Sequence, residues 1–224
     1  MGTGALADAL AWVEYCNRQM TGALEERYTF ADALAVGTYL NIFIRNCDWV
    51  QMANLAQMVN AIAPIVTSPE AAAVQPIWYP VLLHSQAALE MAVDVHVNGP
   101  VVSPELPAGA SRWPFRVGDL GPFGLIDAAA TVSGADVNAH SVAVTLVNRS
   151  PEEELAEVLL RDCAFAGSAQ IRTVTAAPPG DTRTLPDVGT AQLEEGSENP
   201  KDGMIAIRLP PRSFTVIEAA MTVR

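Results

Sequence analysis

The sequence predicts an α+β chain, with a helix-rich part over residues 1–90 followed by an antiparallel β-sandwich over residues 91–224. Apolar residues recur at helical spacing in the first part. The second part contains short apolar runs separated by turn residues, which is typical of a β-sandwich. Half of the residues are hydrophobic and 17% are charged, so the chain has the composition of a folded globular protein.

Two helices are expected before residue 50. Residues 6–15 follow a Gly-Thr-Gly turn in which Thr3 can cap the first turn, and their apolar positions lie at helical spacing. Thr29 followed by Asp32 is typical of a capping box, in which each side chain bonds to the backbone of the other residue. This pair predicts a second helix that ends near Arg45.

A strand and a third helix are expected next. The apolar run over residues 52–58 predicts a buried strand. Residues 75–90 have apolar positions at roughly helical spacing, and Pro80 is compatible with a helix only in its first turn. His84 lies on the apolar side of this helix, so we interpret it as a core or interface histidine.

Amide side chains interrupt the apolar run over residues 50–67. Gln51, Asn54, Gln57 and Asn60 lie three residues apart. A buried amide without a hydrogen-bond partner costs about 1–3 kcal/mol. Either these side chains therefore satisfy one another and the backbone, or at least one of them faces a polar ligand.

The second part of the sequence predicts six short strands. Positions 142–147 suggest a strand that is apolar on one face and partly covered on the other, and residues 93–97 alternate with period two. Residues 98–122 and the polar stretch 182–202 contain Gly and Pro and are predicted to be loops. The predicted strands are residues 127–132, 141–148, 154–160, 170–175, 204–209 and 214–223.

The charge and the cysteines restrict the partners. A net charge of −12 would repel nucleic acid and anionic membranes, so a neutral substrate or a protein partner is expected. Cys16, Cys47 and Cys163 are odd in number, far apart and not clustered with histidines. We therefore expect no disulfide framework, no metal site and no cofactor, and a cytoplasmic, reducing location. Neither a secretory signal nor a membrane-spanning run is recognised in the sequence.

Glu14 is the acidic residue with the most unusual neighbours, because it lies between Trp12-Val13 and Tyr15. Burial between aromatic residues could raise its pKa and allow it to act as an acid. Alternatively, it is a glutamate at the end of a helix that pairs with Arg18 four residues later. Adjacent carboxylates elsewhere are interpreted as solvated surface residues.

Three blocks of the sequence resemble the α-L-arabinofuranosidases of glycoside hydrolase family 51. The first block covers residues 2–17 and contains VEYCN at residues 13–17. The second covers residues 25–64, contains TFADALAV and MANLAQMVNAIAP, and is the most specific. The third is diffuse and consists of residues 76–80, 147–149, 198–200 and 209–213.

The resemblance implies a (β/α)₈ barrel followed by a β-sandwich, and retaining hydrolysis by two glutamates. Residues 1–90 would then be the remnant of such a barrel, with about three helices and one or two strands. The family has an acid/base in an Asn-Glu pair and a nucleophile in an Asp-Glu-Trp context between the first two blocks. Here the chain passes from Asn17 to Leu24 in a few residues, and neither context occurs.

We therefore assign no catalytic residue. Glu14 is kept only as an alternative nucleophile, for an alignment in which residues 11–15 are a diverged form of the family's nucleophile strand. In the family the glutamine of the NLAQ strand reaches the arabinose, so the resemblance implies that Gln57 binds substrate. The partner of the full-length family is an arabinose-containing oligosaccharide, and the family forms homo-oligomers.

Two functions follow as hypotheses. One is a fragment or internally deleted form of an α-L-arabinofuranosidase of L-arabinose metabolism. The complete enzyme would hydrolyse terminal non-reducing α-L-arabinofuranosides, and the fragment would be inactive by itself. The other is a non-catalytic β-sandwich that acts as an interaction module or contacts carbohydrate.

Overall fold

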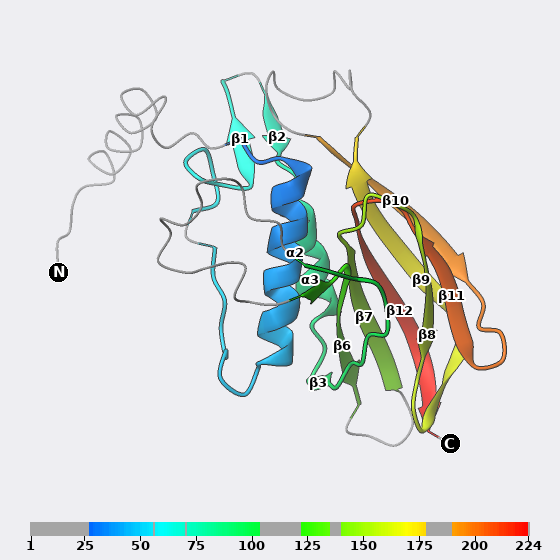
Figure 1. Cartoon of the computed structure of the whole chain (residues 1–224). Helices are drawn as coiled ribbons and strands as arrows, with labels where there is room; N and C mark the ends of the chain where they lie inside the picture. Colours follow the sequence, from blue (N-terminus) through cyan, green and yellow to red (C-terminus); the bar gives the residue numbers. More distant parts are fainter. Residues whose placement is uncertain are drawn as a thin grey trace, which may run out of the picture.

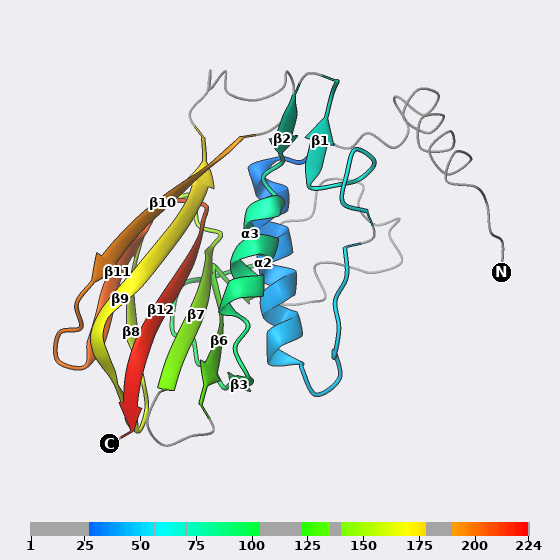
Figure 2. The same ribbon diagram turned by 180° about the vertical axis from the view of Figure 1, so that it is seen from behind.

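The structure is a computed structural model that describes residues 27–55, 57–69, 71–103, 122–134, 140–177 and 190–223. Two helices, α2 (Phe30–Arg45) and α3 (Trp78–Ala87), cover one face of a six-stranded sheet (Figures 1 and 2). A two-stranded sheet lies against the opposite face. The helix expected over residues 6–15 lies outside the described residues.

All pairs of strands are antiparallel, as expected for a β-sandwich. The large sheet has the order β10-β9-β12-β7-β6-β3, and the smaller sheets pair β11 with β8, β1 with β2 and β4 with β5. The strands are β1 (Ile65–Thr67), β2 (Ala72–Val74), β3 (Met91–Val93), β4 (Val101–Val102), β5 (Phe123–Gly124), β6 (Ile126–Ser133), β7 (His140–Asn148), β8 (Glu154–Leu159), β9 (Cys163–Ala176), β10 (Ala191–Glu198), β11 (Met204–Leu209) and β12 (Ser213–Val223).

Strand β7 separates two hydrophobic cores, because successive side chains of a strand point to opposite faces. Val144 belongs to the core shared with Ile205 of β11. Val147 belongs to the core shared with Leu34 of α2 and Leu83 of α3. The alternation predicted for residues 142–147 is therefore confirmed, and the helices are the cover of the second face.

The capping box predicted at the start of α2 is confirmed. Asp32 accepts a hydrogen bond from the backbone N–H of Thr29 at 2.6 Å and another from its hydroxyl group at 2.8 Å. The helix ends at Arg45, where the backbone N–H of Asn46 still bonds to the carbonyl oxygen of Ile42. Helix α3 is shorter than the predicted range, and Pro80 lies in its first turn as required.

The buried strand predicted over residues 52–58 is wrong. The described residues of this range are irregular and exposed, with Met52 and Met58 exposed to 77% and 45%. The apolar composition suggested burial, but a strand also needs a neighbouring strand to pair with. The first bridge in this region joins Val59 to Ile65.

The loop predicted over residues 182–202 is also partly wrong, because β10 occupies Ala191–Glu198. Among the described strands β10 lies at the edge of the large sheet and pairs with β9, and its second half is exposed. Charged side chains are common on such edges, since they oppose pairing with other chains. The polar composition of residues 191–198 therefore led to the prediction of a loop where the structure has a strand. The period-two pattern over residues 93–97 overlaps a strand only at Val93, the last residue of β3.

Before residue 90 the structure describes two helices and the antiparallel pair β1–β2. The remnant of a (β/α)₈ barrel and the domain boundary at residue 90 therefore remain predictions. What the structure establishes is that α2 and α3 share a hydrophobic core with the large sheet.

Gly37 allows α2 to approach the sheet closely. A Cβ atom at this position would lie 3.1 Å from Cδ2 of Phe214 and 3.4 Å from Cγ2 of Val147. We expect Gly37→Val to lower the free energy of unfolding by about 1–3 kcal/mol, because the added methyl groups overpack this contact. Urea unfolding measures the change. Ala35→Val places the same side chain on the exposed side of α2, and an equal loss in this control would contradict the prediction.

Candidate functional site

Residues 49–64, which precede β1 and which we name the Gln57 segment, contain the predicted substrate-binding residue. Gln57 is exposed and lies in irregular backbone, next to Met58. Gln51 and Asn54 are exposed as well. These three amides therefore face solvent and need no buried partner.

Asn60 is the amide of this series that has a structural role. Its Nδ2 atom donates to the hydroxyl oxygen of Thr67 at 3.0 Å, and its Oδ1 atom accepts from the backbone N–H of Thr67 at 2.7 Å. Asn60 and Ile62 have φ angles of 67° and 48°, so the chain turns tightly here in the left-handed region. The interpretation that the amides satisfy local backbone is thus correct for Asn60.

Gln75 is fully buried and forms hydrogen bonds to the C-terminal end of the same segment. Its Nε2 atom donates to the carbonyl oxygen of Ala63 at 2.6 Å, and its Oε1 atom accepts from the backbone N–H of Tyr28 at 2.9 Å. Its own backbone N–H bonds to the carbonyl oxygen of Pro64 at 2.7 Å. Gln75 therefore joins the end of the Gln57 segment to the start of α2. Its sequence context, before Pro76, gave no sign of this role.

The chemistry available in the Gln57 segment is neutral hydrogen bonding. Residues 49–69 contain no charged side chain, so they supply neither a general acid nor a nucleophilic carboxylate. Glu14 lies outside the described residues. Among the residues that the structure does describe, no group of three or more His, Cys, Asp or Glu side chains lies together as a metal site would require.

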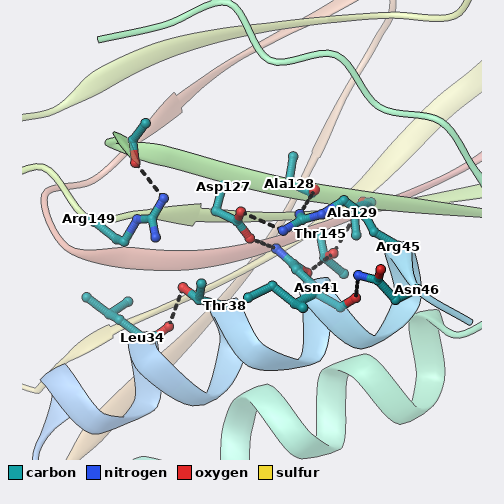
Figure 3. Close-up of polar contacts among 12 residues, drawn as sticks. Leu34, Thr38, Asn41, Arg45, Asn46, Asp127, Ala128, Ala129, Thr145 and Arg149 are labelled. Atoms are coloured by element: carbon teal, nitrogen blue, oxygen red, sulfur yellow. Dashed lines mark hydrogen bonds and ion pairs between the residues drawn. The ribbon is translucent and has the colours of Figure 1, made fainter. Parts of the chain in front are cut away.

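A second polar cluster lies between the helices and the sheet, and its centre is Asn41 of α2. This amide is fully buried. Its Nδ2 atom donates to Oδ2 of Asp127 at 2.8 Å, and its Oδ1 atom accepts from the Thr145 hydroxyl group at 2.6 Å (Figure 3). The Nε2 atom of His84 lies 2.9 Å from the same Oδ1 atom. Asn41 thus connects α2, α3, β6 and β7.

Arg45, Asp127 and Arg149 are the charged residues at the edge of this cluster. Arg45 forms an ion pair with Asp127 at 3.0 Å and donates to the carbonyl oxygen of Ala128 (Figure 3). Arg149 packs over the ring of Phe123. Burial lowers the pKa of the Arg149 guanidinium, while the carboxylate of Asp127 acts in the opposite direction.

His84 is almost completely buried and stacks on the ring of Phe214, with ring centroids 5.0 Å apart. Burial lowers its pKa to about 4, against the opposing effects of the Pro80 carbonyl group and Asp127. The ring is therefore neutral at pH 7. A neutral ring has one N–H, although its nitrogens face the oxygens of Pro80 and Asn41 at 2.8 and 2.9 Å. The prediction of a core or interface histidine is confirmed.

The two clusters have different roles. The cluster around Asn41 has its centre buried between the helices and the sheet, and its hydrogen bonds hold these layers together. The Gln57 segment is exposed and held in place by Asn60 and Gln75. Asn148, the last residue of β7, is fully buried, and its Nδ2 atom bonds to the backbone oxygens of Glu152, Leu209 and Pro210.

Comparison with known proteins identifies the fold. A family model of the α-L-arabinofuranosidase C-terminal domain matches residues 11–213. A probable α-L-arabinofuranosidase C of Aspergillus fumigatus is 32% identical over 193 residues, which are 86% of this chain and 35% of that protein. An exo-α-(1→6)-L-arabinofuranosidase of Bifidobacterium longum is 31% identical over 87% of this chain and 35% of its own length.

Solved structures of α-L-arabinofuranosidases share this fold. An α-L-arabinofuranosidase of Thermotoga maritima in complex with arabinose has a TM-score of 0.65 and 23% identity, covering 88% of this chain and 39% of that chain. A family 51 α-L-arabinofuranosidase of Bifidobacterium longum has a TM-score of 0.64 and 25% identity, with 88% and 36% covered.

The helices, the large sheet and the small sheet thus form the C-terminal domain of a glycoside hydrolase. The chain belongs to the α-L-arabinofuranosidases of glycoside hydrolase family 51, and it spans about a third of the length of the curated relatives named above. Neither of the two helices within the described residues is long and apolar enough to cross a membrane.

We expect Asn41→Leu to lower the free energy of unfolding by about 3 kcal/mol, because it leaves buried groups of Asp127, Thr145 and His84 without their partner. Chemical denaturation measures this loss. Asn46→Leu is the matched control at the C-terminal cap of the same helix, since Asn46 is exposed and its side chain donates to the nearby Ile42 carbonyl oxygen. A loss of similar size in the control would contradict a special role of Asn41.

The lowered pKa of His84 predicts a loss of stability in acid. Between pH 6.5 and about 4 the unfolded chain binds a proton at His84 that the folded chain does not. The free energy of unfolding should therefore fall as the pH decreases through this window, by about 3 kcal/mol in total, and should not depend on His84 above it. His84→Phe removes the titrating group and keeps an aromatic ring against Phe214. Equal slopes of stability against pH in the two proteins would refute the assignment.

Proposed function

We propose that this chain is part of an α-L-arabinofuranosidase that hydrolyses terminal non-reducing α-L-arabinofuranosides, with Gln57 as a contact of the arabinose. The family match over residues 11–213 carries the proposal. The activity of the curated relatives supports it, since both relatives named above are α-L-arabinofuranosidases.

The environment of Gln57 suits this role. An amide both donates and accepts hydrogen bonds, which matches the hydroxyl groups of a neutral sugar. Gln57 is exposed, so it is available to a ligand, and Asn60 and Gln75 hold the residues that follow it. A polar side chain on a fixed scaffold loses less conformational entropy on binding.

We propose further that the chain does not hydrolyse glycosides by itself. Retaining hydrolysis needs two carboxyl groups about 5–5.5 Å apart on opposite sides of the glycosidic bond. Neither the Asn-Glu nor the Asp-Glu-Trp context occurs in the sequence, and the Gln57 segment carries no carboxylate. This chain would then supply the β-sandwich and one wall of a sugar subsite, as a fragment or an internally deleted form.

The remaining parts of the proposal concern the location and the alternative function. Cys47 and Cys163 are free, which supports a reducing, cytoplasmic location. The alternative of a carbohydrate-contacting β-sandwich has less support, because Phe165 and Phe214 are buried in the two cores.

The purified chain should release no 4-nitrophenol from 4-nitrophenyl α-L-arabinofuranoside above the rate of buffer alone, because neither sequence context of the family's two catalytic glutamates occurs in it. The full-length Aspergillus fumigatus relative serves as the positive control in the same assay. Turnover by this chain that is abolished in Glu14→Gln would disprove its inactivity and would assign Glu14 as a catalytic residue.

The role of Gln57 is tested in a chimeric enzyme, in which residues 11–213 replace the matching part of that relative. Gln57→Ala should lower kcat/KM of the chimera about tenfold, the effect of losing one hydrogen bond worth about 1.4 kcal/mol. Gln51→Ala removes an equally exposed amide of the same segment and should leave kcat/KM unchanged. If both variants match the unmodified chimera, Gln57 does not contact the sugar.

A further inference from the structure

The turn that follows Gln57 is closed by backbone hydrogen bonds, and we name residues 58–67 the closed turn. The backbone N–H of Ile65 bonds to the carbonyl oxygen of Met58 at 3.3 Å, and the N–H of Asn60 bonds to the carbonyl oxygen of Ile65 at 2.8 Å. Ile65 is the first residue of β1, so this strand holds the chain directly after Gln57.

The backbone of the closed turn adopts conformations that are unfavourable for its residues. The N–H of Ala61 bonds to the carbonyl oxygen of Val59 at 2.9 Å, around Asn60, whose φ angle is 67°. A three-residue turn with a positive φ at its centre is rare and strained. Ile62 has a φ of 48°, which is a clear outlier for a β-branched residue. Its side chain is exposed, so burial offsets little of this strain.

Two amides supply the contacts that hold this backbone. Asn60 is bonded to the backbone N–H and the hydroxyl group of Thr67, and the buried Gln75 is bonded to the carbonyl oxygens of Ala63 and Pro64. Gln75 also bonds to the backbone just before α2, and β1 lies beside the start of that helix (Figures 1 and 2). The closed turn is therefore tied to a helix that packs on the large sheet.

A turn that only connected α2 to β1 would be more stable without this strain, since glycine adopts a positive φ at no steric cost. Strained residues persist where the surrounding contacts over-determine the backbone, and they cluster at sites that clamp a ligand. The closed turn has both properties in view of its position. It is strained and cross-linked, and it begins directly after Gln57.

We propose that Asn60 is a positioning residue, which holds the closed turn so that Gln57 presents its amide to the arabinofuranoside in one direction. Gln75 anchors the other end of the turn. The inference rests on the proposed contact between Gln57 and the sugar. Asn60 does not touch the sugar itself, and its effect is to reduce the conformational freedom that Gln57 loses on binding.

Backbone NMR relaxation of the purified chain tests the first step without any activity. The order parameter of the Gln57 N–H should be about 0.85, the value of rigid backbone, and should fall below about 0.6 in Asn60→Gly. Glycine tolerates the positive φ, so this variant removes the bonds to Thr67 without adding strain. Asn60→Asp keeps the acceptor for the Thr67 N–H and should retain the order of Gln57. A low order parameter in the wild-type chain, or one that Asn60→Gly leaves unchanged, would overturn the proposal.

The chimeric enzyme that carries residues 11–213 tests the second step. Asn60→Gly should lower its kcat/KM about fivefold, because Gln57 must then be ordered when the sugar binds. The same substitution should have no further effect in a chimera that already carries Gln57→Ala, since Asn60 acts through that residue. Asn46→Gly is the matched control, because it removes an amide that bonds to the backbone at the end of α2, and it should leave kcat/KM unchanged.

The double variant separates positioning from stability. If the losses caused by Asn60→Gly and Gln57→Ala add in full, Asn60 only stabilises the fold and the proposal is wrong. An equal loss in Asn46→Gly would contradict it as well. No effect of Gln57→Ala would refute the sugar contact itself, whereas an effect of Gln57→Ala without one of Asn60→Gly would refute the positioning role alone.

Discussion

The amide of Asn41 is the contact on which the arrangement of the layers depends. It lies on α2, and its two polar atoms meet Asp127 of β6, Thr145 of β7 and His84 of α3. Any shift of α2 along the sheet would leave several buried polar groups without partners, and each such group costs about 1–3 kcal/mol. Apolar packing alone tolerates sliding, whereas these hydrogen bonds define one position of the helix.

Close packing and this polar network act together. Gly37 brings α2 near Phe214, and the ring of Phe214 in turn stacks on His84 of α3. The histidine is kept neutral by its burial. Helix, helix and sheet therefore share one boundary, in which the apolar contacts supply most of the free energy and the polar contacts supply the alignment.

Much of this fold could be predicted from local patterns. The capping box at Thr29, the strand β11 and the alternation along β7 follow from the sequence, because each depends on neighbours in the chain. Strand β10 could not be recognised, because its polar residues suit an exposed edge as well as a loop. Asn41 and Gln75 were missed for a related reason. A buried amide is identified by its distant partners, and these lie on other elements.

The segment at residues 52–58 is not the strand that its sequence predicts, and its apolar residues Met52, Leu55 and Met58 are exposed. Both findings have one cause. Its apolar composition requires burial, yet the described part of the chain offers it neither a pairing strand nor a covering layer. A conflict between local sequence and local structure is expected where a protein has a function to perform. In this segment the conflict coincides with Gln57, the residue that we propose to contact the sugar.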